Sequence, residues 1–160
     1  MVHFKIIGGE IEPTIEMSTS ELVFDLKSKI EDELEVEVHR QNLWYKGIEM
    51  EGETRIGFYA LLGDEREIFI VTLVVDLLPP DLKLHVLVKF LGRGSEGYVR
   101  VRETDTVSDL RGKVSRYWGI PVDSFILRRL NVEMVNDRPL HAYYINEASE
   151  IHLSVNIQPR

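Results

Sequence analysis

The sequence contains no cysteine. Disulfide bonds, thiolate metal sites and thiol catalysis are therefore excluded. Long apolar runs are also missing. The longest, residues 68–75, is interrupted by Thr72 and followed by Asp76, so nothing approaches the roughly 18 apolar residues of a membrane span. The first residues, Met-Val-His-Phe-Lys-Ile-Ile, lack a basic stretch leading into an apolar core, so no secretory signal is predicted. These absences favour a cytoplasmic or nuclear protein with no membrane partner.

Composition and charge indicate a folded protein whose two halves differ. Hydrophobic residues make up 44% and charged residues 29% of the chain, which is ordinary for a folded soluble protein. The net charge of −8 is unevenly spread: residues 1–80 carry 7 Lys and Arg against 17 Asp and Glu, and residues 81–160 carry 12 against 10. An acidic half repels phosphate backbones, and the second half is only weakly basic, so no nucleic-acid partner is expected.

An internal repeat is the most informative feature of the sequence. Apolar residues at steps of 3, 4 and 4 predict one amphipathic helix in each half. The second set lies 84 residues after the first; the sets are Val23, Leu26, Ile30 and Leu34, and Val107, Leu110, Val114 and Trp118. The same offset relates five further pairs: Leu43 and Leu127, Met50 and Met134, Ile56 and Leu140, Tyr59 and Tyr143, and Leu61 and Ile145. The chain is therefore a duplication.

Each copy has the same predicted order of elements. Two strands joined by a glycine-containing turn (2–7 and 14–17; 84–90 and 98–102) precede the helix, and short strands (43–45; 126–128) and a last strand (68–73; 151–155) follow it. This order predicts an α+β fold in which one helix packs on a mixed sheet. We expect domains at 1–75 and 83–160, joined by a stiff linker, 76–82, that contains Pro79 and Pro80.

Smaller features of each copy can also be predicted. Thr106 and Asp109 have the spacing of an N-terminal capping arrangement for the second helix. Ser20 is the nearest candidate cap for the first. Leu77 and Leu78 are too apolar for a solvated linker, so we expect them to pack against one domain.

Several segments resemble ubiquitin. Residues 138–145 resemble its Arg-Thr-Leu-Ser-Asp-Tyr-Asn-Ile, residues 119–123 its Gly-Ile-Pro-Pro-Asp, and residues 149–153 its Ser-Thr-Leu-His-Leu. In the first copy, residues 26–30 resemble Val-Lys-Ala-Lys-Ile and residues 43–47 resemble Leu-Ile-Phe-Ala-Gly. The resemblance spans about 2–75 and 83–156 and implies two ubiquitin-like β-grasp domains. It also implies that Tyr59 and Tyr143 are buried and bond a backbone group.

Ubiquitin binds partners through an apolar patch on its sheet: an isoleucine of the third strand, a leucine of the first turn and a His/Val pair of the last strand. The resemblance places Trp44 at the isoleucine position, while Gly8-Gly9 replaces the leucine. If residues 68 and 70 face the core, alternation turns Phe69 and Val71 outward. Ile48 extends the patch. The predicted protein-binding residues of the first copy are thus Trp44, Ile48, Phe69 and Val71, unless the linker or second domain covers them or the register is wrong.

The second copy lacks this patch. Arg128 takes the central position, Ser154 replaces the valine, and His152 alone matches. With Arg129 and Arg138, these residues predict a polar, basic face, with Arg128 and His152 as the protein-binding candidates. The alternative is a solvated face that binds nothing.

No pattern predicts an enzyme, a cofactor or a metal site. The five histidines are scattered, and the glycine-rich turn at 92–97 precedes a strand and lacks a P-loop lysine. The resemblance implies a non-conjugated adaptor, because neither copy ends in Gly-Gly, with partners such as ubiquitin receptors or proteasome components. Two alternatives remain open: a scaffold that self-associates through its charge asymmetry, and a conjugatable modifier whose native chain extends beyond residue 160.

Overall fold

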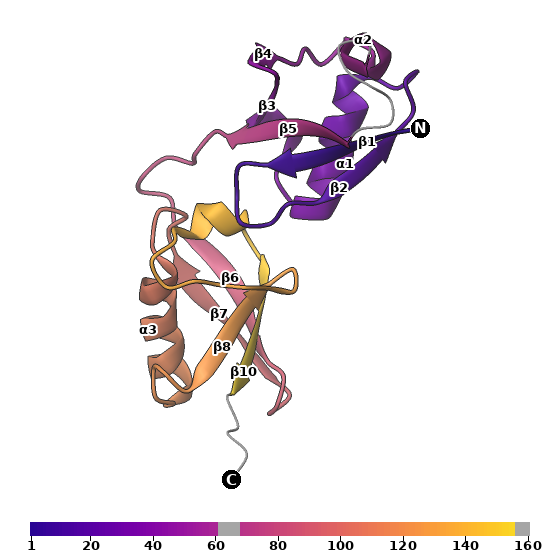
Figure 1. Cartoon of the computed structure of the whole chain (residues 1–160). Helices are drawn as coiled ribbons and strands as arrows, with labels where there is room; N and C mark the ends of the chain where they lie inside the picture. Colours follow the sequence, from indigo (N-terminus) through magenta and orange to yellow (C-terminus); the bar gives the residue numbers. More distant parts are fainter. Residues whose placement is uncertain (61–67, 156–160) are drawn as a thin grey trace. The chain divides into compact units, whose positions relative to one another are not determined.

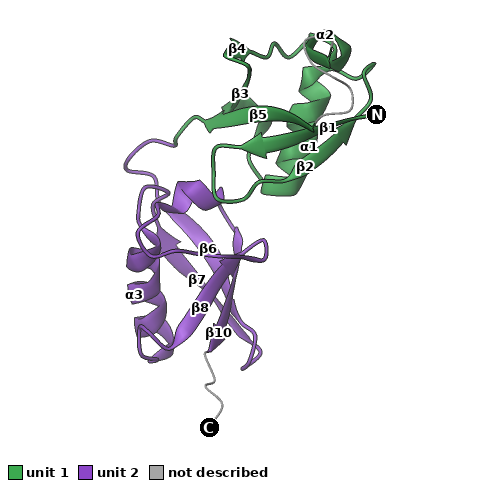
Figure 2. Cartoon of the chain, in the orientation of Figure 1, with its two compact units in different colours: residues 1–77 green, residues 78–160 purple. Residues whose placement is uncertain are grey.

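The computed structural model describes residues 1–60 and 68–155. The chain divides into two compact units, Met1–Leu77 (unit 1) and Leu78–Arg160 (unit 2), as Figure 2 shows. Each contains a five-stranded mixed sheet and a twelve-residue helix. The predicted α+β fold, duplicated along the chain, is confirmed. Leu61, expected to match Ile145, and the glycine-free tail after Val155 lie outside the described residues.

Unit 1 has the sheet order β2-β1-β5-β3-β4, in which β1 and β5 are parallel and the other pairs antiparallel (Figure 1). Its elements in chain order are β1 (Val2–Ile7), β2 (Thr14–Met17), α1 (Val23–Leu34), the 3-10 helix η1 (Val38–Arg40), β3 (Gln41–Tyr45), β4 (Ile48–Glu49), α2 (Ile56–Ala60) and β5 (Ile68–Val75).

Unit 2 repeats this order as β7-β6-β10-β8-β9, with β6 and β10 parallel. Its elements are β6 (Leu84–Phe90), β7 (Ser95–Val101), α3 (Val107–Trp118), β8 (Phe125–Arg129), β9 (Val132–Glu133), the 3-10 helix η2 (Leu140–Tyr143) and β10 (Glu150–Val155).

The core of each unit lies between the helix and one face of the sheet. In α1 the four residues of the predicted stripe are buried, and in α3 Val107, Leu110 and Val114 are buried as well. Trp118, the last stripe residue of α3, is only half-buried, and its Nε1 donates a hydrogen bond to Ser95 Oγ at 2.8 Å. The helix stripe was therefore predicted correctly except at its last position.

The two buried tyrosines behave as expected. Tyr59 and Tyr143 are at most 2% exposed. The hydroxyl of Tyr59 accepts a hydrogen bond from the Glu51 N–H at 2.9 Å, and that of Tyr143 accepts one from the Val135 N–H at 2.7 Å. Each therefore fixes the segment between the short edge strand and the following turn.

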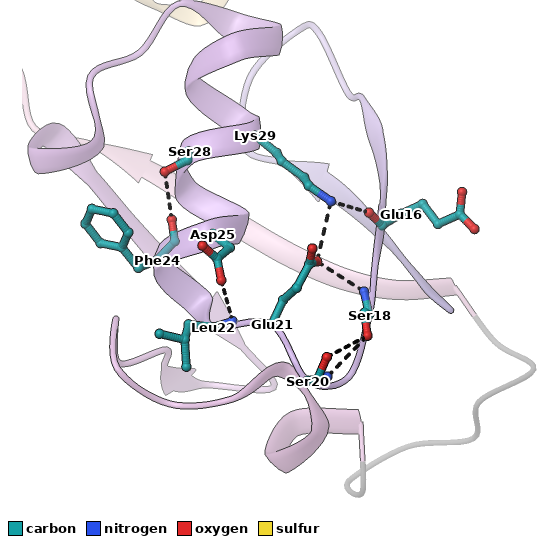
Figure 3. A network of polar contacts seen from close by, with 9 residues as sticks. All are labelled: Glu16, Ser18, Ser20, Glu21, Leu22, Phe24, Asp25, Ser28 and Lys29. Carbon is teal, nitrogen blue, oxygen red and sulfur yellow. Dashed lines mark hydrogen bonds and ion pairs between the residues drawn. The ribbon is translucent and has the colours of Figure 1, made fainter.

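The two helices begin differently. Thr106 is the N-cap of α3: its Oγ1 accepts from the Asp109 N–H, and the Asp109 carboxylate accepts from the Thr106 N–H, which confirms the predicted capping box. The expectation of Ser20 in unit 1 is wrong. The N-cap of α1 is Leu22, whose N–H donates to Asp25 Oδ2 at 2.8 Å (Figure 3). Leucine has no side-chain acceptor, so Asp25 makes the bond from inside the helix.

Two residues of the predicted linker make hydrogen bonds, one to each unit. Asp76 exchanges hydrogen bonds with Arg40 of unit 1, and the Leu78 N–H donates to the Glu103 carboxylate of unit 2. Leu77 is 51% exposed and Leu78 half-buried. The side chain of Leu77 is therefore not packed as expected. Leu78 makes a backbone hydrogen bond to unit 2. Among the described residues, no helix is long and apolar enough to cross a membrane.

A glycine allows the β1–β2 turn to lie against β5. Gly8 has φ of 125°, and a Cβ there would lie 2.3 Å from the carbonyl oxygen of Leu73. Other residues are excluded both by this backbone conformation and by the close approach. Gly8 is thus part of the sheet end in unit 1.

Candidate functional site: the exposed face of the sheet

The last strand of unit 1 has the opposite orientation to the predicted one. Phe69 is 3% and Val71 0% exposed, whereas Ile68 is 55% and Ile70 46% exposed. Phe69 packs against Phe4 and Tyr45, with ring centroids 5.4 and 5.8 Å away. The assignment of Phe69 and Val71 to a binding surface is therefore wrong: both belong to the core.

The physical reason is that the repeat changes register before the last strand. Trp44 of β3 lies opposite Thr72, and Arg128 of β8 lies opposite His152. Trp44 and Arg128 are 84 residues apart, but Thr72 and His152 are 80 apart, so unit 1 has four more residues between these two strands than unit 2 has. The expectation that Ile68 and Ile70 face the core equates them with the buried Ile151 and Leu153, an offset of 83. That register is wrong by three residues, and because side chains alternate along a strand, an error of an odd number exchanges the two faces.

The exposed face of unit 1 carries a shallow groove of about 600 Å³. It is lined by Trp44, Lys46, Gly47, Ile70, Thr72 and Val74. Trp44 is 37% and Val74 49% exposed, and Ile68 continues the same side of β5. We call the four exposed apolar residues Trp44, Ile68, Ile70 and Val74 the sheet-face patch. Sequence reasoning found Trp44 but missed the other three as exposed residues.

Ile48 is exposed, as predicted, but it lies outside the groove. It pairs with Tyr45, which is 2% exposed, whereas Trp44 pairs with Glu49. Paired residues of antiparallel strands point to the same side of the sheet, so Ile48 belongs to the side opposite Trp44. Its expected place in the patch is therefore not supported by the register.

Basic side chains border the patch on neighbouring elements. Lys5 and His3 of β1 pair in register with Ile70 and Ile68. Lys5 Nζ lies 3.9 Å from Glu12 and His3 Nε2 4.0 Å from Glu16, at the outer edge of the sheet. On the other side, Lys46 lies in the turn between β3 and β4, 5.4 Å from the Tyr45 ring centroid. The patch thus lies between basic side chains on an otherwise acidic unit.

The same face of unit 2 is polar. Arg128 replaces Trp44, His152 replaces Thr72, and Glu150 and Ser154 stand in place of Ile70 and Val74. Glu150 accepts hydrogen bonds from Lys89 Nζ at 2.8 Å and bonds His152 Nε2 at 2.8 Å, while Arg128 Nη1 donates to Ser154 Oγ at 3.3 Å. The bond from Lys89, and then that from His152, lowers the pKa of Glu150, and the bond to Glu150 raises the pKa of Lys89.

Arg129 does not share this face, contrary to the expectation of a basic surface that includes it. It is 1% exposed, and its guanidinium lies 3.5 Å from the carbonyl oxygens of Tyr144 and Glu150. Arg128 and Arg129 are consecutive in β8, so alternation sends them to opposite sides of the sheet. The polar face of unit 2 is therefore less basic than predicted.

The family assignment follows from two sheets of identical topology and from a match along the sequence. The ubiquitin family model matches the chain twice, over residues 2–72 and 86–158. The chain belongs to the ubiquitin family.

Trp44, which the resemblance placed at the position of the central isoleucine, lines the groove together with Val74 of the last strand. One signal in the sequence could have located Val74. Thr72 is the one polar residue in the run 68–75, and a lone polar residue in an apolar strand marks the solvent side. Counting alternate residues from Thr72 gives Ile68, Ile70 and Val74. Among the described residues, no group of three or more His, Asp or Glu side chains is placed to hold a metal ion.

Proposed function

We propose that this ubiquitin-family chain is a non-catalytic adaptor and that the sheet-face patch of unit 1 binds a helix of a partner protein. The observation that carries the proposal is the exposure of Trp44, Ile70 and Val74 around one groove. Contiguous exposed apolar surface marks interaction sites, and Trp is enriched among residues that dominate binding energy.

The dimensions of the patch suit an amphipathic helix. The solvent side of β5 runs from Ile68 through Ile70 and Thr72 to Val74, which spans roughly 20 Å at about 3.3 Å per residue. A helix of three to four turns, at about 5.4 Å per turn, has that length. One apolar stripe at positions i, i+4 and i+7 would contact the groove along its whole course.

Charge also favours one kind of helix. Lys5 and Lys46 border the patch on either side. A partner helix that carries Asp or Glu beside its apolar stripe would place carboxylates near these ammonium groups. Such rim contacts contribute mostly to orientation and to the rate of association.

The test is isothermal titration of the full chain with a synthetic ubiquitin-receptor helix that has acidic flanks. We expect Trp44→Ala to weaken binding by about 30-fold, the effect of losing about 2 kcal/mol at a binding hot spot. Arg128→Ala, at the matched position of unit 2, is the control and should change the affinity by less than about twofold. Equal loss in both variants, or no binding by the unaltered chain, would refute the proposal.

A further inference from the structure

A second groove, in unit 2, has a different chemistry from the sheet-face patch. It lies between β7 and α3, measures about 430 Å³, and is lined by Tyr98, Val99, Arg100, Lys113, Arg116 and Tyr117. Tyr98 and Tyr117 are 59% and 56% exposed, which is high for aromatic side chains. We call this surface the basic–aromatic groove.

The aromatic wall of the groove is held in place. Tyr117 lies over Gly97, where a Cβ would come within 2.3 Å of its hydroxyl oxygen. The Tyr117 ring also packs on Trp118 at a centroid distance of 4.3 Å. Trp118 is in turn anchored through its bond to Ser95. Gly97 therefore makes room for a tyrosine that is supported on one side and exposed on the other.

Lys113 makes a hydrogen bond to the edge strand of the sheet at one point of the groove. β7 is the first strand in the sheet order, and Lys113 Nζ donates to the carbonyl oxygen of Arg100 at 2.6 Å. In unit 1, Lys29 makes the same contact with the carbonyl of Glu16 at 3.1 Å. The lysine contact is thus common to both copies, so a structural role is enough to account for the presence of Lys113. Recognition in the groove must rest on side chains at the other positions.

Those other positions differ in charge between the copies. The residues 84 positions before Tyr98, Arg100, Arg116 and Tyr117 are Thr14, Glu16, Asp32 and Glu33. Unit 2 has two arginines and two tyrosines where unit 1 has three carboxylates and a threonine. Arg100 and Arg116 are both exposed. The shared fold does not require this change, because the acidic version folds in unit 1.

We propose that the basic–aromatic groove binds an acidic, extended segment of a partner protein. Arg100 and Arg116 would pair with carboxylates of that segment, since guanidinium matches carboxylate geometry through two parallel hydrogen bonds. The rings of Tyr98 and Tyr117 would pack against the methylene groups of the acidic side chains in that segment. The whole chain has a net charge of −8, so general attraction cannot bring an anion to it, and binding requires this local cluster. The groove acts independently of the sheet-face patch.

The experiment is fluorescence anisotropy of a fluorescein-labelled octaglutamate peptide titrated with the full chain at low ionic strength. We expect saturable binding that Arg100→Glu and Arg116→Glu each weaken by about tenfold or more. Lys83→Glu makes the same charge change at an exposed position of unit 2 outside the groove. It should alter the affinity by less than about twofold. Unchanged thermal unfolding midpoints will show that the variants are folded.

Three results would overturn the proposal. The first is no binding to the unaltered chain, and the second is an equal loss in all three variants, which would mean that net charge alone acts. In the third, light scattering shows that the chain self-associates and that Arg116→Glu abolishes this, so that the acidic unit of a second copy fills the groove instead.

Discussion

Two consecutive residues of β5 have opposite roles. The Phe69 side chain is buried between two aromatic rings, and the Ile70 side chain lines the open groove. Truncation of a buried phenylalanine removes about 3–5 kcal/mol of unfolding free energy, because the site cannot fully collapse around the cavity. Truncation of a half-exposed isoleucine leaves no such cavity.

We therefore predict that Phe69→Ala lowers the free energy of unfolding of unit 1 by about 3–5 kcal/mol, and Ile70→Ala by less than about 1 kcal/mol. Urea denaturation followed by tryptophan fluorescence measures both. The reverse order of the two losses would show that the strand has the other register.

The hydrogen bonds on the polar face of unit 2 lead to a prediction about the protonation of Glu150. Glu150 bonds both Lys89 and His152, and these bonds lower its pKa. A carboxylate whose pKa is lowered in the folded state contributes stability at neutral pH, and this contribution is lost as the pH falls through the lowered pKa. The contribution is small because the group is exposed to solvent.

Side-chain carboxyl NMR should accordingly give Glu150 a titration midpoint below that of an ordinary glutamate. In Lys89→Ala the midpoint should rise, since the largest cause of the shift is removed. A Glu150 midpoint that is the same with and without Lys89 would contradict the bond.

Residue by residue, the sequence predicts positions well where polarity alternates and poorly where it does not. Val99 and Val101 alternate with arginines, and they are buried as expected. The run 68–75 is apolar on both sides of the strand apart from Thr72. Thr72 is then the one sequence signal for the solvent side, and pairing with β1 and β3 fixes the register.

At the scale of the element, helix starts differ in what holds them. In α3 a threonine side chain and an aspartate bond each other's backbone N–H groups. In α1 the cap residue is a leucine, and Asp25 alone supplies the acceptor. Because a lone carboxylate three residues into a helix is a weak sequence signal, only the α3 start could be predicted.

We predict that Thr106→Ala lowers the free energy of unfolding of unit 2 by about 1 kcal/mol, since one helical N–H loses its acceptor. Ser20→Ala should change that of unit 1 by less than about 0.5 kcal/mol, because Ser20 does not cap α1. Thermal unfolding followed by circular dichroism measures both. A large loss for Ser20→Ala would contradict the Leu22–Asp25 arrangement.

The order of the elements could be predicted more completely than which side of each strand faces the core. β1 and β6 have the expected bounds, and the helix stripes repeat at one offset from α1 to the buried tyrosines. The offset fails for β5 and β10, because the connection before the last strand is four residues longer in unit 1 than in unit 2. Connections tolerate deletions that strands and helices do not, so a repeat is least dependable after a connection.

On the scale of the whole molecule, duplication has preserved the core and altered the surface. The buried stripe, the tyrosine bonds and the lysine that closes the sheet edge occur in both units. The exposed sheet face is apolar in unit 1 and polar in unit 2, and the helix–edge surface is acidic in unit 1 and basic in unit 2. Two units with different surfaces are suited to two different partners.

The most direct test of this account is a two-dimensional amide NMR titration of the isotopically labelled full chain with the ubiquitin-receptor helix. The account predicts that the signals of Trp44, Ile70 and Val74 shift, that those of Arg128, His152 and Ser154 stay in place, and that Ile70→Asp removes the shifts. Equal shifts at the matched positions of both units, or shifts that persist in Ile70→Asp, would contradict it.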